Sequence, residues 1–226
     1  MTKDIVKDDI QLQKDSTINY IVKNGQKTKY EPWLEEVLTF TYDWIMKNKV
    51  FPGRLSADFI KHDEINRDLL GELKNKRILE LGTGSGRMSK VLDRSNYYVG
   101  VDISRGLLKK ASKRFSKGRF SEYDLFLASA IDLPFKEDVF DFGICNLAFN
   151  FFPDIGQVIS EIRRTLSPNG KFFCSVPVPE RKRKEATIHG TLLSEEELKT
   201  LFFESGFRFN SLPYLNGAIL YFIASY

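Results

Sequence analysis

The residues best suited to chemistry lie in one short segment, Glu80–Arg87, where an apolar run meets alternating glycines. Ile78–Leu81 is the apolar run, and Gly82, Gly84 and Gly86 follow it at every second position. Glycine lets the backbone turn sharply and lets a ligand approach the main chain closely. A helix that begins after such a turn directs its free N–H groups at that ligand. The segment therefore predicts a ligand-binding loop at the carboxyl end of a buried strand.

Two acidic residues narrow the class of ligand. Glu80 directly precedes the glycines, and Asp102 ends the next apolar run, Tyr97–Val101. Dinucleotide-binding loops have the spacing GxGxxG, whereas this loop has GxGxG. A carboxylate at Glu80 repels a pyrophosphate and favours a ligand with an ammonium or sulfonium group, while Asp102 can accept hydrogen bonds from both ribose hydroxyls. A purely structural glycine turn, a helix N-cap at Asp102 and a nicotinamide cofactor remain alternatives.

The sequence after Arg77 alternates between short apolar runs and helical patterns. We expect strands at 78–81, 97–101, 125–128, 140–147, 171–176, 207–212 and 219–224, and helices at 88–92, 107–115, 155–166 and 195–203. This alternation predicts an α/β fold, a Rossmann-like seven-stranded and mostly parallel sheet with helices on both faces. The connection 213–218 is too short for a parallel crossover, so one strand at the end should be antiparallel.

The first 75 residues differ from the rest in pattern. Residues 1–30 are polar and mixed in charge, and we expect a loose arm or a short helix there. Pro32 opens an amphipathic helix that Phe51-Pro52-Gly53 should stop, and a second helical pattern carries Ile65 and Leu69 on one face. The chain is thus expected to divide into an N-terminal arm and helical lid, residues 1–75, and a ligand-binding domain, residues 76–226.

The order of these motifs resembles that of the class I S-adenosylmethionine-dependent methyltransferases, in particular the branch of small-molecule enzymes. The resemblance rests on the glycine loop, Asp102, the Ala130–Phe135 segment, Phe140-Asp141 and the Leu166–Lys171 segment. It implies S-adenosylmethionine as the cofactor, with the methionine part at the glycine loop and the ribose at Asp102. The residues implied in cofactor binding are Glu80, Gly82, Thr83, Gly84, Gly86, Asp102, Ile103, Ser129, Ala130, Ile131, Asn146 and Leu147.

Two of these positions depart from family patterns. Ser129 stands where the family usually has an Asp that contacts the adenine amino group, although a hydroxyl can also accept a hydrogen bond. Backbone groups of Ala130 and Ile131 could read the edge of the ring instead. Asn146 is placed beside the sulfonium by the resemblance, but it lacks the two prolines that follow in amino-directed DNA methyltransferases. Methylation of base amino groups is therefore disfavoured.

The acceptor side of the site is less marked in the sequence. The resemblance suggests Trp33, Asn150 and Phe151 as substrate-binding residues, and other N-terminal aromatics such as Tyr42 could roof the pocket. His189 is the candidate general base. The alternatives are ordinary ones: aromatic core packing, a polar residue at a helix start for Asn150, and an exposed loop histidine.

The expected reaction is in-line methyl transfer to an oxygen, nitrogen or carbon atom of a small molecule, driven mainly by alignment. Arg181-Lys182-Arg183-Lys184 could instead recruit RNA or a protein substrate, although a solvated loop is the commoner meaning of such a run. For the basic residues of 105–119 the commoner meaning is a solvated helix face. A cofactor-binding module without turnover is a third reading.

Bulk composition limits the other possibilities. The 226 residues carry a net charge of +4, which does not require a nucleic-acid partner. No apolar run is long enough to span a bilayer and no signal peptide is apparent, so we expect no membrane partner and a cytoplasmic location. Cys145 and Cys174 lie in apolar runs and should be buried, reduced thiols, and no cysteine–histidine cluster predicts a metal. The oligomeric state stays open.

Overall fold

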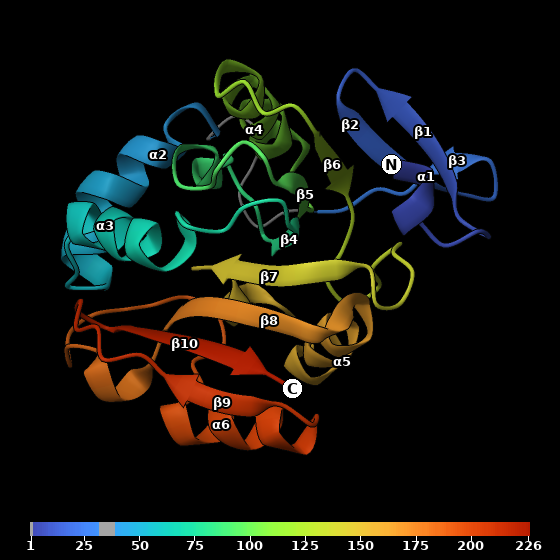
Figure 1. Ribbon diagram of the computed structural model, residues 1–226. Coiled ribbons are helices and arrows are strands. Elements are labelled where there is room, and N and C mark those ends of the chain that lie inside the picture. The colour runs from blue at the N-terminus through green and yellow to red at the C-terminus, as the bar shows by residue number, and fades with distance from the viewer. Residues whose placement is uncertain (1, 32–38) are drawn as a thin grey trace.

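A mixed β-sheet runs through the computed structural model, which describes residues 2–31 and 39–226 (Figure 1). Seven of its strands lie in the order β6 (Tyr123–Leu127), β5 (Tyr97–Asp102), β4 (Arg77–Leu81), β7 (Phe140–Asn146), β8 (Leu166–Pro177), β10 (Ile219–Ser225) and β9 (Arg208–Ser211). Neighbours from β6 to β8 pair in parallel, whereas β10 is antiparallel to both β8 and β9. The predicted α/β class with a mostly parallel, Rossmann-like sheet is confirmed. The winding direction reverses between β4 and β7, which is where ligands bind in such sheets.

The N-terminal segment corrects one expectation. Only Thr2–Ile5 (α1) is a short helix, and the rest of the segment forms β1 (Gln11–Asp15), β2 (Ile18–Lys23) and β3 (Gln26–Lys27). Because β2 pairs in parallel with β6, the sheet grows from the expected seven strands to ten, and Figure 1 shows the hairpin beside β6. The physical reason is that buried side chains of β2 point in turn to the two faces of the sheet. Ile18 and Tyr20 pack into the core on one face of the sheet, and Ile21 packs into the core on the other.

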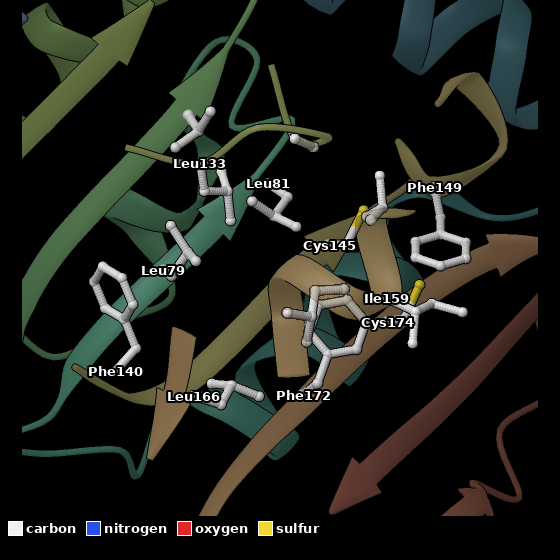
Figure 2. Close-up of a cluster of buried hydrophobic side chains, with 14 of the residues drawn as sticks. Leu79, Leu81, Leu133, Phe140, Cys145, Phe149, Ile159, Leu166, Phe172 and Cys174 are labelled. Atoms are coloured by element: carbon white, nitrogen blue, oxygen red, sulfur yellow. The ribbon is translucent and has the colours of Figure 1, made fainter. Parts of the chain in front are cut away.

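Helices cover both faces of the sheet and produce two hydrophobic cores. α5 (Ile155–Thr165) and α6 (Glu195–Glu204) pack on one face, and α3 (Phe59–Leu70) and α4 (Arg105–Lys117) pack on the other. Strand side chains alternate between the cores with the pleat. Figure 2 shows part of the first core, where Cys145 and Cys174 lie on neighbouring strands. Both are buried free thiols, as predicted.

The helices before β4 depart from the predicted boundaries. α2 (Tyr42–Ile45) continues as the π-type helix η2 (Met46–Arg54), so the predicted stop at Phe51-Pro52-Gly53 is wrong. Phe51 is buried against Phe59 and His62, and this packing outweighs the helix-breaking preference of the Pro-Gly pair. The predicted start at Pro32 lies outside the described residues.

The helix expected at 88–92 is only a single turn. Residues Arg87–Lys90 form the 3₁₀ turn η3, and the remaining residues of the predicted helix follow it as a turn and a bend. The turn begins directly after Gly86, which has a left-handed backbone.

Gly86 should tolerate no side chain, because its φ is +77° and an added Cβ would lie 2.6 Å from the Ala111 Cα. We expect Gly86→Ala to lower the free energy of unfolding by about 2–4 kcal/mol, the sum of backbone strain and overpacking. Urea denaturation measures this. The matched control is Gly53→Ala, where an added Cβ meets no heavy atom within 4 Å and the change should stay within about 1 kcal/mol. Equal effects of the two substitutions would contradict the packing of the loop on α4.

Candidate active site

Three hollows that share lining residues lie side by side at the carboxyl ends of β4, β5 and β7. The central hollow encloses about 900 Å³, part of it open to solvent, between the glycine loop, the end of β5 and the segments after β6 and β7. Beside it lie the Arg87 hollow, of about 470 Å³, and the His189 hollow, of about 540 Å³. Tyr42 and Leu147 line all three. Leu147 has a φ of +56°, an uncommon backbone conformation for such a residue that is found more often at functional sites.

The three glycines of the loop have different roles. An added Cβ at Gly82 would lie 2.3 Å from the Ala148 Cβ, and Gly86 packs on α4, so both are small for packing reasons. At Gly84 the nearest atom would be the Tyr42 hydroxyl oxygen, 3.8 Å away, although the residue has a φ of +52°. Gly84 therefore leaves open space over the loop, where a ligand can approach the backbone.

Asp102 is held at the tip of β5 by backbone N–H groups. Gly84 N donates to its Oδ2 and Ser104 N donates to its Oδ1, both at 2.8 Å. Burial raises the pKa of this carboxyl, and the hydrogen bonds from Ser104 and Gly84 oppose that rise. Ser104, rather than Asp102, caps α4. The carboxylate is thus fixed in the wall of the central hollow and keeps lone pairs for further donors.

Glu80 is a second buried carboxyl, on the neighbouring strand. Its Oε2 accepts hydrogen bonds from the Thr83 hydroxyl at 2.9 Å and from the Tyr98 hydroxyl. Burial raises the pKa of Glu80 to about 8 against the effect of these hydrogen bonds, and the nearby Asp102 adds to the rise. Near neutral pH the group is therefore mostly a neutral acid, whereas the expected repulsion of a pyrophosphate requires it to be ionised.

The second oxygen of Glu80 points to a ligand of positive charge. Glu80 lines the Arg87 hollow, and its Oε1 makes no hydrogen bond to the described residues. A cation bound there would favour the ionised form and lower the pKa of Glu80. A bound cation would thus stabilise the ionised form of Glu80, which burial alone disfavours.

The structure brings most of the predicted cofactor residues together. The central hollow is lined by Gly82, Gly84, Asp102, Ile103, Ser129, Ala130, Asn146 and Leu147. Glu80 and Thr83 line the Arg87 hollow instead. Gly86 and Ile131 line none of the three hollows. Gly86 packs against Ala111 instead, and the Ile131 carbonyl accepts a hydrogen bond from Gln157. The roles of these residues toward a cofactor stay predictions.

The predicted acceptor residues gather in the His189 hollow. Asn150, Phe151 and His189 line it, whereas Trp33 lies outside the described residues. Asn150 Nδ2 donates to the His189 carbonyl at 2.7 Å, which fixes the backbone of that loop. The exposed imidazole of His189 makes no hydrogen bond to the described part of the chain, so no group there orients it as a base.

The basic residues are more engaged than a solvated face would be. Arg181 donates to the Ile219 carbonyl at 3.1 Å and pairs with Glu195 at 3.4 Å. In α4, Arg114 and Lys110 pair with Asp43, at 2.7 and 3.5 Å. At least part of each predicted basic cluster is therefore used to hold the fold.

Asp43 is the centre of a clasp that fixes α2 over the glycine loop. It accepts hydrogen bonds from the Ser85 hydroxyl at 2.7 Å and from Arg114, which also donates to the Ser85 carbonyl at 3.0 Å. Although burial acts to raise the pKa of Asp43, the hydrogen bonds from Arg114 and Ser85 outweigh it and hold the pKa below its ordinary value. The clasp places the neighbouring Tyr42 at the junction of the hollows.

His62 and Arg87 are site residues that sequence reasoning missed. His62 is buried in α3 and lines the Arg87 hollow, and Arg87 pairs with Asp63 at 2.5 Å. A signal for His62 exists, because it precedes Ile65 by three residues and so lies on the apolar face of the helix. Arg87 follows the glycines directly but carries no pattern that distinguishes it from a surface residue.

The glycine loop and the strands around it match a known protein family. Residues 79–174 match the family model described as a methyltransferase domain. This match covers less than half of the chain, and solved S-adenosylmethionine-dependent methyltransferases share the fold. The family's cofactor is S-adenosylmethionine. A S-adenosylmethionine-dependent methyltransferase from Aquifex aeolicus shares the fold of this domain with a TM-score of 0.64, at 13% identity over 85% of this chain and 98% of that one.

Curated relatives of the methyltransferase domain match over shorter stretches. An uncharacterized protein from Methanocaldococcus jannaschii is 31% identical over 58% of this chain and 64% of its own length. The ubiquinone/menaquinone biosynthesis C-methyltransferase of Rickettsia felis is 32% identical over 50% of this chain and 48% of its own length. The match thus spans less than two thirds of each of these relatives.

Two other features of the described residues bear on partners. In residues 2–31 and 39–226 no helix combines the length and the apolar character needed to cross a membrane. The same residues contain no group of three or more His, Cys, Asp or Glu side chains placed to hold a metal ion.

The raised pKa of Glu80 predicts a specific dependence of stability on pH. The pKa of Glu80 in the folded protein, about 8, lies above its value in an unfolded chain. The contribution of Glu80 to the free energy of unfolding is therefore greatest below about pH 4.5 and is lost as the pH rises to about 8. The free energy of unfolding of the wild type relative to Glu80→Gln should fall over this range, by at most about 1.4 kcal/mol per pH unit. Urea denaturation from pH 5 to 8 measures it. The control is Glu122→Gln, at an exposed carboxyl. If the difference in free energy of unfolding between the wild type and Glu80→Gln were as constant with pH as that for Glu122→Gln, the raised pKa of Glu80 would be refuted.

Proposed function

We propose that the chain transfers a methyl group from S-adenosylmethionine to a small acceptor molecule with a largely apolar body. The observation that carries the proposal is the junction of the hollows at Leu147 and Tyr42, where a cofactor-sized hollow meets an apolar one. The proposal places the cofactor in the central hollow and the acceptor in the His189 hollow. In-line transfer then takes place between them, where alignment supplies much of the rate.

The residues present fit the cofactor. Gly84 leaves a cradle that a Cβ would occupy, and Asp102 has lone pairs for the ribose hydroxyls. Glu80 would balance the positive charge of the methionine end from the adjoining hollow. Ser129 and Ala130 line the central hollow where the resemblance places the adenine. S-adenosylmethionine, when bound, supplies a methyl group on a positively charged sulfur.

The lining of the His189 hollow supports an acceptor of mixed character. Its apolar members are Met46, Val50, Leu55, Leu147, Phe151, Pro177 and Ile188, and its polar ones are Tyr42, Arg54, Asn150 and His189. Pockets of this kind bind small molecules by apolar contact and orient them by a few polar groups. The C-methyltransferase among the relatives supports carbon as one possible acceptor atom. His189 is the candidate base at this hollow, since its ring is exposed to it.

RNA or protein substrates are less well supported. Arg181 and Lys182 both donate to backbone carbonyls of this chain, which removes half of the basic loop 181–184 from simple recruitment. We further propose that residues 1–75 supply the arm and the lid and that residues 76–226 form the cofactor domain. The buried free thiols of Cys145 and Cys174 favour a reducing compartment such as the cytoplasm.

The cofactor half of the proposal is tested by calorimetry with S-adenosylmethionine. We expect one molecule bound per chain and an affinity about 10–100-fold lower for Asp102→Ala, because charge-assisted hydrogen bonds to the ribose are lost. Asp15→Ala is the control, since Asp15 is exposed and lines none of the three hollows. NADH should give no heat. The absence of heat and of a thermal shift at millimolar S-adenosylmethionine would refute the proposal.

The acceptor half is tested with S-adenosylmethionine labelled in its methyl group. After incubation with cell extract, we expect the label in the small-molecule fraction. Label in RNA or protein would support recruitment through the basic loop instead, and binding without any transfer would support a non-catalytic module.

A further inference from the structure

A chain of buried polar groups joins the start of α3 to the end of β7 through His62. The His62 ring nitrogens lie 2.8 Å from the Tyr221 hydroxyl, at Nδ1, and 2.9 Å from Asn146 Oδ1, at Nε2. The Tyr221 hydroxyl is in turn 3.3 Å from Asn216 Nδ2, and Asn216 binds the backbone of Asp58 with both ends of its amide. Of these groups, only Asn146 has a role in methyl transfer above, as a residue that lines the central hollow.

The direction of every hydrogen bond in the chain follows from its first member. The Asp58 backbone N–H can only donate, so it fixes Asn216 Oδ1 as its acceptor at 2.8 Å and leaves Asn216 Nδ2 to donate to the Tyr221 hydroxyl. With Asn216 as its donor, the Tyr221 hydroxyl has His62 Nδ1, among the described residues, as the acceptor for its own proton. His62 must then carry its single proton on Nε2, and that proton is donated to Asn146 Oδ1.

Asn146 is thereby held with its oxygen turned away from the site. Oδ1 accepts from both His62 and the Ser175 hydroxyl, the latter at 2.5 Å. Nδ2 has no hydrogen-bond partner among the described residues and is not one of their enclosed unpartnered atoms. Since Asn146 lines both the central and the Arg87 hollows, its free N–H groups are open to them.

We propose that His62 is a positioning residue that presents the Asn146 NH₂ group to the central hollow beside Leu147, where the reacting atom of the acceptor must enter from the His189 hollow, and that the site thereby selects acceptors with a hydrogen-bond-accepting oxygen at this point. The inference rests on the proposed function and defines its substrate class further. A phenolate, enolate or carbonyl oxygen can accept from Asn146, whereas an amino group would place its own N–H donors against the amide donors. The burial of His62, which lowers its pKa to about 4, keeps the ring neutral with one proton.

The direct test is the tautomer of His62 in ¹⁵N-labelled protein. The chain has only two histidines, so long-range ¹H–¹⁵N spectra at pH 7, assigned with His189→Gln, resolve the ring of His62. We expect the proton on Nε2, and in Tyr221→Phe we expect this preference to be lost. A proton on Nδ1 in the wild type would overturn the proposal. This test needs neither cofactor nor turnover, so its failure is distinct from a failure of S-adenosylmethionine to bind.

The selection of the acceptor is tested with two probes of the same shape, 4-nitrophenolate and 4-nitroaniline, on protein saturated with S-adenosylhomocysteine. We expect the Asn146 side-chain resonances to shift with 4-nitrophenolate only. A shift with 4-nitroaniline, or with neither probe, would overturn the selection.

Two variants of His62 separate positioning from packing. Gln at this position offers one acceptor and one donor, as the histidine does, so His62→Gln should keep the response of Asn146 to 4-nitrophenolate, and His62→Phe should lose it. An equal response in both variants would show that His62 does not orient Asn146.

Discussion

The free-energy cost of burying two carboxyl groups at the ends of adjacent strands is the constraint on which the site depends. Glu80 and Asp102 lie on the neighbouring strands β4 and β5, and the charge of Asp102 adds to the rise in the pKa of Glu80. The fold satisfies Asp102 with backbone N–H groups from the glycine loop and from the start of α4. Glu80 accepts hydrogen bonds from the Thr83 and Tyr98 hydroxyl groups, and its raised pKa keeps it mostly protonated near neutral pH. This arrangement leaves one carboxyl oxygen of Glu80 with no hydrogen bond to the described residues, for a positive ligand.

The N-terminal helices complete the site and do more than cover it. The Asp43 clasp fixes α2 to the glycine loop and to α4, and Tyr42 consequently lies where the hollows meet. α3 contributes His62, whose ring connects Tyr221 on β10 with Asn146 on β7. α2 and η2 line the His189 hollow, and α3 reaches the Arg87 hollow through His62. A segment outside the matched residues 79–174 therefore supplies part of the wall of both hollows.

The sequence predicts the sheet and the glycine loop well because their signals are local. Apolar runs mark the buried strands, and the residues after β4 and β5 must meet at one edge of a parallel sheet. The N-terminal hairpin escapes prediction because β1 is mostly polar and exposed and β2 has only four consecutive buried residues, Ile18 to Ile21, one of them the polar Asn19. The helix through Pro52 and the burial of His62 depend on contacts distant in sequence, such as that with Tyr221. The raised pKa of Glu80 likewise depends on burial, which no local pattern measures.

We expect the buried carboxyl of Glu80 to ionise when a positive ligand occupies the site. The number of protons released on binding S-adenosylmethionine at pH 7, from calorimetry in two buffers of different ionisation enthalpy, measures this ionisation. About one proton per ligand should be released from the wild type and close to none from Glu80→Gln. No net release from the wild type, or an equal release from both proteins, would contradict it.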